Sequence, residues 1–332
     1  MINELKKLMK IQGVSSREDK VAAFIADTIR PYVDEIKKDP LGNLICLKRG
    51  TSKNAKKVML CAHMDEIGFM VNFIQDNGIV RITRVGRINY YAYAHNRVEF
   101  ENGAVGVLVP EGKTEIKDLT PEKYYVDLGV KTKAEAERKV KLGEMCAVKT
   151  DLFKLYGTKY TGRPFDDRIG CYVVMEIAKK LGKCANDVYF VFSAQEEVGC
   201  RGSHAASYNV QPDIGIAFDV TPSGDVINAP TNFSVKLGDG AAIKIKDNSV
   251  MCDRALVAAM FDTAKKNGIK HQTEVLTYGG TDTSSMQTVA GGSRAGCISI
   301  PTRYCHTQNE VIDMKDVEAC IDLGVLCCSL DI

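Results

Sequence analysis

The second half of the chain alternates apolar runs of strand length with amphipathic helical segments, and this alternation restricts the fold more than any other feature. The runs 187–193 (DVYFVFS) and 213–219 (DIGIAFD) are continuously apolar apart from their ends. Apolar residues at helical spacing predict helices at 168–181 and 254–267, each followed by a glycine that can end it. Strands that alternate with helices predict an α/β fold, with a largely parallel sheet between helical layers.

A different pattern interrupts this alternation between about residues 67 and 155. Short β-rich runs there alternate with Gly and Asn turns, and a single helix is predicted at 133–141. The apolar strands before residue 67 fit the same sheet as the second half of the chain. We therefore predict one α/β/α domain from residues 1–66 and 156–332, with a small β-rich domain inserted at 67–155.

Composition excludes several classes of protein. The chain has 332 residues, with 44 Lys and Arg against 42 Asp and Glu, and the resulting charge of +2 argues against nucleic-acid or anionic-membrane partners. No apolar window approaches the ~18 residues of a membrane-spanning helix. The twelve cysteines are scattered through apolar runs without a CxxC pair, which is typical of a reduced compartment. We expect a cytoplasmic protein.

Residues that can bind metals or move protons follow the predicted strands. In open α/β sheets, ligand sites lie beyond the carboxyl ends of the strands. Five segments place such residues at this edge or at the start of the helix that follows it: His63 and Asp65, Asp166 and Asp167, Glu196 and Glu197, Asp219, and His306. This coincidence is the strongest functional signal that the residues themselves provide.

Histidine and carboxylate together form a ligand set for zinc, cobalt or manganese. Five ligands exceed the needs of one tetrahedral ion but suit two ions that share a bridging carboxylate. Of the adjacent Glu196 and Glu197, one would bind metal and the other would take a proton from water; the spacing leaves open which does which. Asp65 lies at i+2 from His63, on the same side of an extended strand, where a carboxylate can orient the imidazole.

Each of these features also has an ordinary structural explanation. A Glu pair after a strand usually lies in a solvated loop, and an Asp pair before a helix is most often an N-cap. Only the joint placement favours a metal centre. Other chemistry has less support, because YGGTDTSS (278–285) lacks a P-loop lysine and no GxSxG motif is present. Cys305 and His306 are adjacent, so on a strand they would face opposite sides.

Several longer motifs resemble the M42 family of dinuclear metallo-aminopeptidases, which includes glutamyl aminopeptidases and the tetrahedral TET peptidases; some members carry an endoglucanase label. The similarity spans nearly the whole chain. Ser16 and Thr283 depart from the family's usual Gly and Ala. The matching stretches are GVSSREDKV (13–21), DPLGNLI (39–45), CAHMDEIGFMV (61–71), GRPFDDRIGCYV (162–173), FSAQEEVGCRGS (192–203), IAFDV (216–220), YGGTDTSSMQ (278–287) and IPTRYCHTQNEV (300–311).

The resemblance implies a function and a role for each site residue. It implies hydrolysis of the N-terminal residue of short peptides, with two divalent ions per subunit, zinc or cobalt first and manganese as an alternative. Asp166 would bridge the ions and Glu196 would be the general base, with Asp65 behind His63. The five implied metal ligands are His63 and Asp219 for one ion, Glu197 and His306 for the other, and Asp166 for both. The β-rich insertion would be a dimerisation domain that builds a homo-oligomer, often of twelve subunits.

Three alternative functions share part of this residue pattern. A related metallo-amidase or carboxypeptidase would use a similar metal centre, and blocked N-termini would distinguish it. A glycoside hydrolase needs two carboxylates in an aromatic-lined groove, whereas this chain has no Trp and its carboxylates accompany His. A non-catalytic assembly protein would have lost ligands, yet all five are present.

Overall fold

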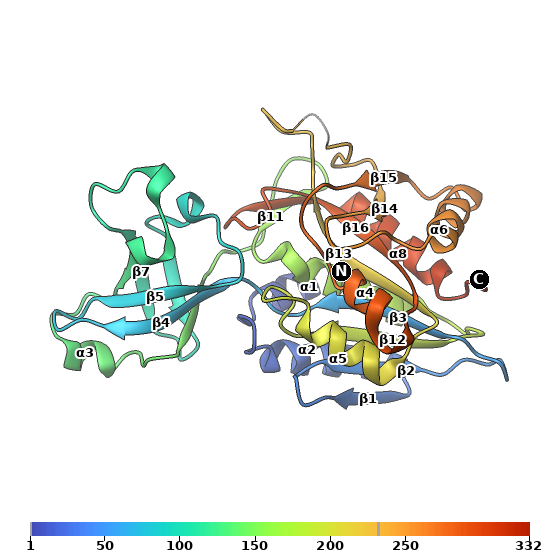
Figure 1. Cartoon of the computed structure of the whole chain (residues 1–332), viewed down its shortest axis with the longest axis horizontal. Coiled ribbons are helices and arrows are strands. Elements are labelled where there is room, and N and C mark those ends of the chain that lie inside the picture. The colour runs from blue at the N-terminus through green and yellow to red at the C-terminus, as the bar shows by residue number, and fades with distance from the viewer. Residues whose placement is uncertain (1, 231–232) are drawn as a thin grey trace.

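The computed structural model describes residues 2–230 and 233–332. A small β-barrel lies beside a larger α/β part, and the chain crosses between them twice (Figure 1). The twelve cysteines are free thiols. Within the described residues, no helix combines the length and the apolar character needed to cross a bilayer.

The α/β part is built on an eleven-stranded mixed sheet. Its four central strands run parallel in the order β12-β3-β13-β16, as the sequence predicts, whereas the flanking pairs β1-β2, β2-β12, β16-β17, β17-β11 and β11-β10 are antiparallel. β14 pairs with both β15 and β16. The strands are β1 (Glu35–Lys38), β2 (Leu44–Lys48), β3 (Lys57–His63), β10 (Phe153–Lys154), β11 (Lys159–Gly162), β12 (Asp187–Ser193), β13 (Ile214–Pro222), β14 (Ala241–Lys246), β15 (His271–Val275), β16 (Arg294–Arg303) and β17 (Glu310–Asp313).

Helices cover both faces of this sheet, because its central strands are apolar on both sides. In β3, Val58 and Leu60 pack into the core beneath one helical layer, whereas Met59 and Cys61 point into the opposite one. The first layer consists of α1 (Ile2–Met9), α2 (Asp19–Ile29), α4 (Phe165–Lys180), α6 (Arg254–Lys266) and α8 (Met314–Cys327). The second consists of α5 (Arg201–Val210) and α7 (Thr283–Thr288). Short 3₁₀ turns occur at Arg30–Tyr32, Tyr90–Tyr93, Ile116–Asp118, Pro121–Lys123 and Val289–Gly291.

The barrel has its own apolar core and closes in the order β4-β5-β8-β7-β6-β9. The predicted helix at 133–141 is shorter in the structure, where α3 (Lys133–Glu137) begins with a capping box and Val140 beyond it is buried in the barrel core. β10 lies within the 67–155 range but pairs with β11 of the large sheet. The barrel strands are β4 (Gly68–Ile74), β5 (Val80–Val85), β6 (Arg97–Phe100), β7 (Val105–Pro110), β8 (Tyr124–Asp127) and β9 (Met145–Val148).

Candidate active site

The register of the central strands brings the predicted site residues to one edge of the sheet. Ser193, the last residue of β12, pairs with His63, the last residue of β3, so the Glu pair emerges beside the histidine. On the other side of β3, Cys61 pairs with Ala217, which puts Asp219 level with His63. β13 continues to Pro222, so Asp219 lies within the strand and not after it as the apolar run indicated.

Asp166 lies between two imidazoles. Its Oδ1 is 3.1 Å from His63 Nε2, and its Oδ2 is 3.0 Å from His306 Nε2. The side chain is buried at the start of α4, where the backbone of Asp166 and Asp167 departs from helical geometry. Each oxygen of this one carboxylate therefore faces a different histidine, which is the arrangement that a bridging ligand requires.

One further carboxylate accompanies each histidine. Asp219 Oδ1 lies 4.0 Å from His63 Nε2, and Glu197 Oε1 lies 3.6 Å from His306 Nε2. Glu197 Oε1 is buried without a hydrogen-bond partner among the described residues. An unpaired buried carboxylate oxygen is costly unless a cation or a donor reaches it. The histidine and carboxylate donors thus fit divalent cations, and the structure gathers all five predicted ligands.

Glu196 presents one carboxylate oxygen to this cluster. Its Oε2 is 3.9 Å from His63 Nε2, whereas its Oε1 accepts a hydrogen bond from the Cys200 thiol at 3.2 Å. Glu196 therefore lies at the site without standing between the two imidazoles. This position suits a group that exchanges a proton with a reacting water.

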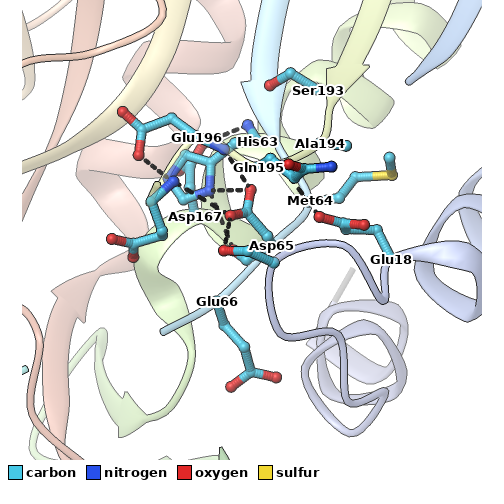
Figure 2. Close-up of polar contacts among 12 residues, drawn as sticks. Glu18, His63, Met64, Asp65, Glu66, Asp167, Ser193, Ala194, Gln195 and Glu196 are labelled. Atoms are coloured by element: carbon cyan, nitrogen blue, oxygen red, sulfur yellow. Dashed lines mark hydrogen bonds and ion pairs between the residues drawn. The ribbon is translucent and has the colours of Figure 1, made fainter. Parts of the chain in front are cut away.

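Asp65 contacts the Glu pair more directly than it contacts the imidazole. Its Oδ1 accepts from the backbone N–H of Glu196 at 2.9 Å, and its Oδ2 accepts from that of Glu197 at 3.2 Å. The nearer partner of His63 Nδ1 is the backbone carbonyl of Asp65 at 3.1 Å; the carboxylate Oδ1 is 3.5 Å away. Figure 2 shows Asp65 between the imidazole and the Gln195–Glu196 backbone, so one side chain orients both.

Burial and mutual repulsion disfavour the negative charge that these carboxylates carry. Burial, with the charge of Asp166, raises the pKa of Glu197 to about 7, despite the opposing effect of His306. Burial likewise raises the pKa values of Asp219 and Glu196 well above their usual range. Burial would raise the pKa of Asp166 too, but hydrogen bonds from both histidines lower it. Bound cations would supply the compensating positive charge.

Glu310 is the most informative residue that the sequence analysis did not single out. Its Oε2 accepts from the backbone N–H groups of Phe165 at 2.6 Å and Asp166 at 3.2 Å, and its Oε1 accepts from that of His306 at 3.0 Å. It therefore ties the segment of the bridging aspartate to that of a histidine. The available signal was its place four residues after His306, within a matching motif.

Asp167 and Glu66 also support the site from outside the ligand set. Asp167 accepts from Gly170 N at 3.0 Å, as an N-cap does, and from His63 N at 3.2 Å. The Asp pair thus divides into one residue that faces the imidazoles and one that caps the helix. Glu66 points away from His63 (Figure 2), and its Oε2 accepts a hydrogen bond from Arg163 Nη1 at 2.9 Å.

Comparison with known proteins identifies the family. A family model described as M42 glutamyl aminopeptidase matches residues 42–323. The chain belongs to the M42 peptidase family. It is 42% identical over 326 residues to an Acetivibrio thermocellus protein named "Putative aminopeptidase", covering 98% of this chain and 97% of that protein. It is 33% identical over 333 residues to the lysyl aminopeptidase of Pyrococcus furiosus, covering 96% and 94%.

Solved structures agree with this assignment. The TET1 peptidase of Pyrococcus horikoshii superposes on this M42 chain with a TM-score of 0.89 at 30% identity, covering 100% of this chain and 99% of that one. The resemblance therefore includes the barrel as well as the α/β part.

Proposed function

We propose that this M42 chain is a metal-dependent aminopeptidase that hydrolyses the N-terminal residue of short peptides. The observation that carries the proposal is the carboxylate of Asp166, which faces His63 with one oxygen and His306 with the other. Asp219 and Glu197 would complete the ligand sets of two divalent ions. The names of the relatives, which include a lysyl and a glutamyl aminopeptidase, support a peptidase acting on N-terminal residues.

In this proposal the side chains of the protein orient the reacting groups and transfer the proton. Two bound divalent ions would lower the pKa of a water and polarise the scissile carbonyl. Glu196 accepts the water's proton at Oε2 and donates it to the leaving amine nitrogen, since its Oε1 is occupied by the Cys200 thiol. Asp65 holds Glu196 in place through its backbone N–H. The substrate's free α-amino group would bind at the same cluster, which restricts cleavage to the terminal residue.

We also propose that residues 67–155 serve as a dimerisation domain and that residues 1–66 and 156–332 form the catalytic domain. The barrel has an apolar core separate from that of the large sheet, so it can act as an independent contact module. The Pyrococcus horikoshii TET1 peptidase assembles into a tetrahedron or a large octahedral shell. Light scattering on the purified chain tests the proposal, and a monomer at micromolar concentration would contradict it.

Hydrolysis of aminoacyl-p-nitroanilides with matched N-acetylated controls tests the catalytic proposal. Each substrate is assayed after chelation and again with added zinc, cobalt or manganese. We expect cleavage of the unblocked substrates only, lost on chelation and restored by metal. Glu196→Gln should retain metal while kcat falls by about 10²–10⁴-fold. Cleavage of the acetylated substrates would favour a metallo-amidase, and an undiminished kcat in Glu196→Gln would exclude it as the base.

A further inference from the structure

A cavity of about 780 Å³ opens between the barrel and the α/β part, and Glu197 forms part of its wall. Three arginines line it: Arg84 and Arg87 come from β5 of the barrel and the turn after it, and Arg201 begins α5. None of them belongs to the proposed metal-ligand set or transfers a proton in the proposed peptidase chemistry.

The cavity wall is strongly positive. Across residues 2–230 and 233–332, no carboxylate lies within ion-pair distance of Arg84, Arg87 or Arg201; the contact of Arg201 Nε is with the carbonyl of Val198 at 3.1 Å. Among the described residues that line the wall, Glu197 is the one acidic residue, and it is a proposed metal ligand. Glu122 acts on Arg84 from beyond ion-pair distance. Guanidinium groups that share a cavity repel one another, and an anion placed among them relieves that repulsion.

The positive wall adjoins the candidate active site. Gly86 lies between Arg84 and Arg87 with a φ of +81°, and a Cβ at this position would lie 3.3 Å from the Cβ of Glu197. The barrel turn therefore packs against the loop that carries Glu196 and Glu197. A peptide whose N-terminus lies at the metal cluster can extend from there into the cavity.

We propose that Arg84, Arg87 and Arg201 bind the C-terminal carboxylate of a short peptide substrate; this inference rests on the proposed aminopeptidase function. The guanidinium fork matches a carboxylate with two parallel hydrogen bonds. The cavity volume falls within the ~300–1,000 Å³ of pockets that hold drug-sized ligands, which is the size of a di- or tripeptide and exceeds one side chain. The arginines also come from both parts of the molecule, with Arg84 and Arg87 on the barrel and Arg201 at the start of α5.

A peptide held in this way is recognised at both ends. The free amine binds at the proposed metal cluster, and the free carboxylate binds the arginines. Neutralising the carboxylate should remove the second interaction and leave the first intact. Because hydrogen bonds between charged partners are among the stronger ones, we expect an effect of about ten-fold or more.

The test compares kcat/KM for Leu-Gly-Gly with that for Leu-Gly-Gly-amide, using the metal-loaded enzyme. In the unaltered protein we expect the free acid to be favoured about ten-fold or more, mainly through KM. In the double variant Arg84→Gln/Arg87→Gln, and in Arg201→Gln, this ratio should fall towards one. Arg138→Gln is the matched control, because Arg138 is an exposed arginine at the end of α3 that does not line the cavity; it should keep the full ratio.

A ratio near one in the unaltered enzyme, with both peptides cleaved, would overturn the inference and leave the proposed function standing. Cleavage of neither peptide, with metal shown to be bound, would refute the proposed function and this inference with it. A second pair, Glu-Ala-amide and Gln-Ala-amide, identifies the other source of a carboxylate. If the arginine substitutions change the Glu-Ala-amide to Gln-Ala-amide ratio but leave the Leu-Gly-Gly to Leu-Gly-Gly-amide ratio unchanged, the arginines bind an acidic N-terminal side chain. Our assignment would then be wrong.

Discussion

Replacement of Glu310 by Gln should damage both the fold and the proposed metal site, although Glu310 is not a proposed ligand. The side chain is buried, and its two oxygens accept three backbone N–H groups, from Phe165, Asp166 and His306. A glutamine has the same shape but offers one acceptor oxygen. Its amide NH₂ group must then face at least one backbone N–H, donor against donor.

The loss of folding stability follows from the number of backbone N–H groups that keep an acceptor. In the less costly orientation the amide oxygen serves Phe165 and Asp166, and the N–H of His306 loses its acceptor. A buried unpaired donor costs about 1–3 kcal/mol, so we expect the free energy of unfolding to fall by that amount. Because the lost bond orients a histidine ligand segment, metal affinity should fall by about 10–100-fold.

Urea unfolding with and without chelator measures the first effect, and competition with a colorimetric zinc chelator measures the second. Glu176→Gln is the matched control, since Glu176 is a buried residue of α4 that pairs with Lys179 away from the cluster. That change should cost less than about 1 kcal/mol and leave metal affinity unaltered. If Glu310→Gln unfolds and binds metal like the unaltered protein, the backbone bonds of Glu310 do not organise the site.

Three further predictions concern metal, charge and pH. Added zinc, cobalt or manganese should stabilise the metal-free protein, by about 2.7 kcal/mol when the free metal concentration is 100 times the dissociation constant. Thermal unfolding at graded metal concentrations measures this, and an unchanged unfolding temperature would show that the site binds no metal. Lys244 is buried with Glu274 at 2.9 Å and Asp247 at 3.2 Å, so Lys244→Met should destabilise the protein by about 3–5 kcal/mol in urea unfolding; a loss below about 1 kcal/mol would contradict this. Burial raises the pKa of Asp316 from 3.8 to about 6, so the folded state binds its proton more tightly than the unfolded state does. The unfolding free energy should therefore fall as pH rises from about 4 to 6, and Asp316→Asn should flatten that slope; an unchanged slope would be the contrary result.

The central strands could be predicted because each is apolar along its whole length. The run 187–193 is β12 with the predicted limits, and the run 213–219 corresponds to β13, which spans Ile214–Pro222. Burial on both faces demands such continuous runs, so the parallel core and its helical cover follow from the residues alone. The antiparallel flanks did not follow, because short strands such as β10 and β11 carry no comparable pattern.

The sequence by itself determined which residues stand at the carboxyl edge of the sheet, because they lie at the end of an apolar run or within a few residues after it. His63, Glu196 and Glu197 needed no tertiary information to be placed there. The tertiary structure decided how they are held: Asp65 on the backbone of the Glu pair, and Glu310 joining two distant segments. Such contacts connect carboxylates to backbone N–H groups, which every residue except proline has. No pattern of side chains in the sequence can therefore predict them. The cavity lined by Arg84, Arg87 and Arg201 was likewise decided by the tertiary structure, since its wall exists only once the barrel packs beside the α/β part.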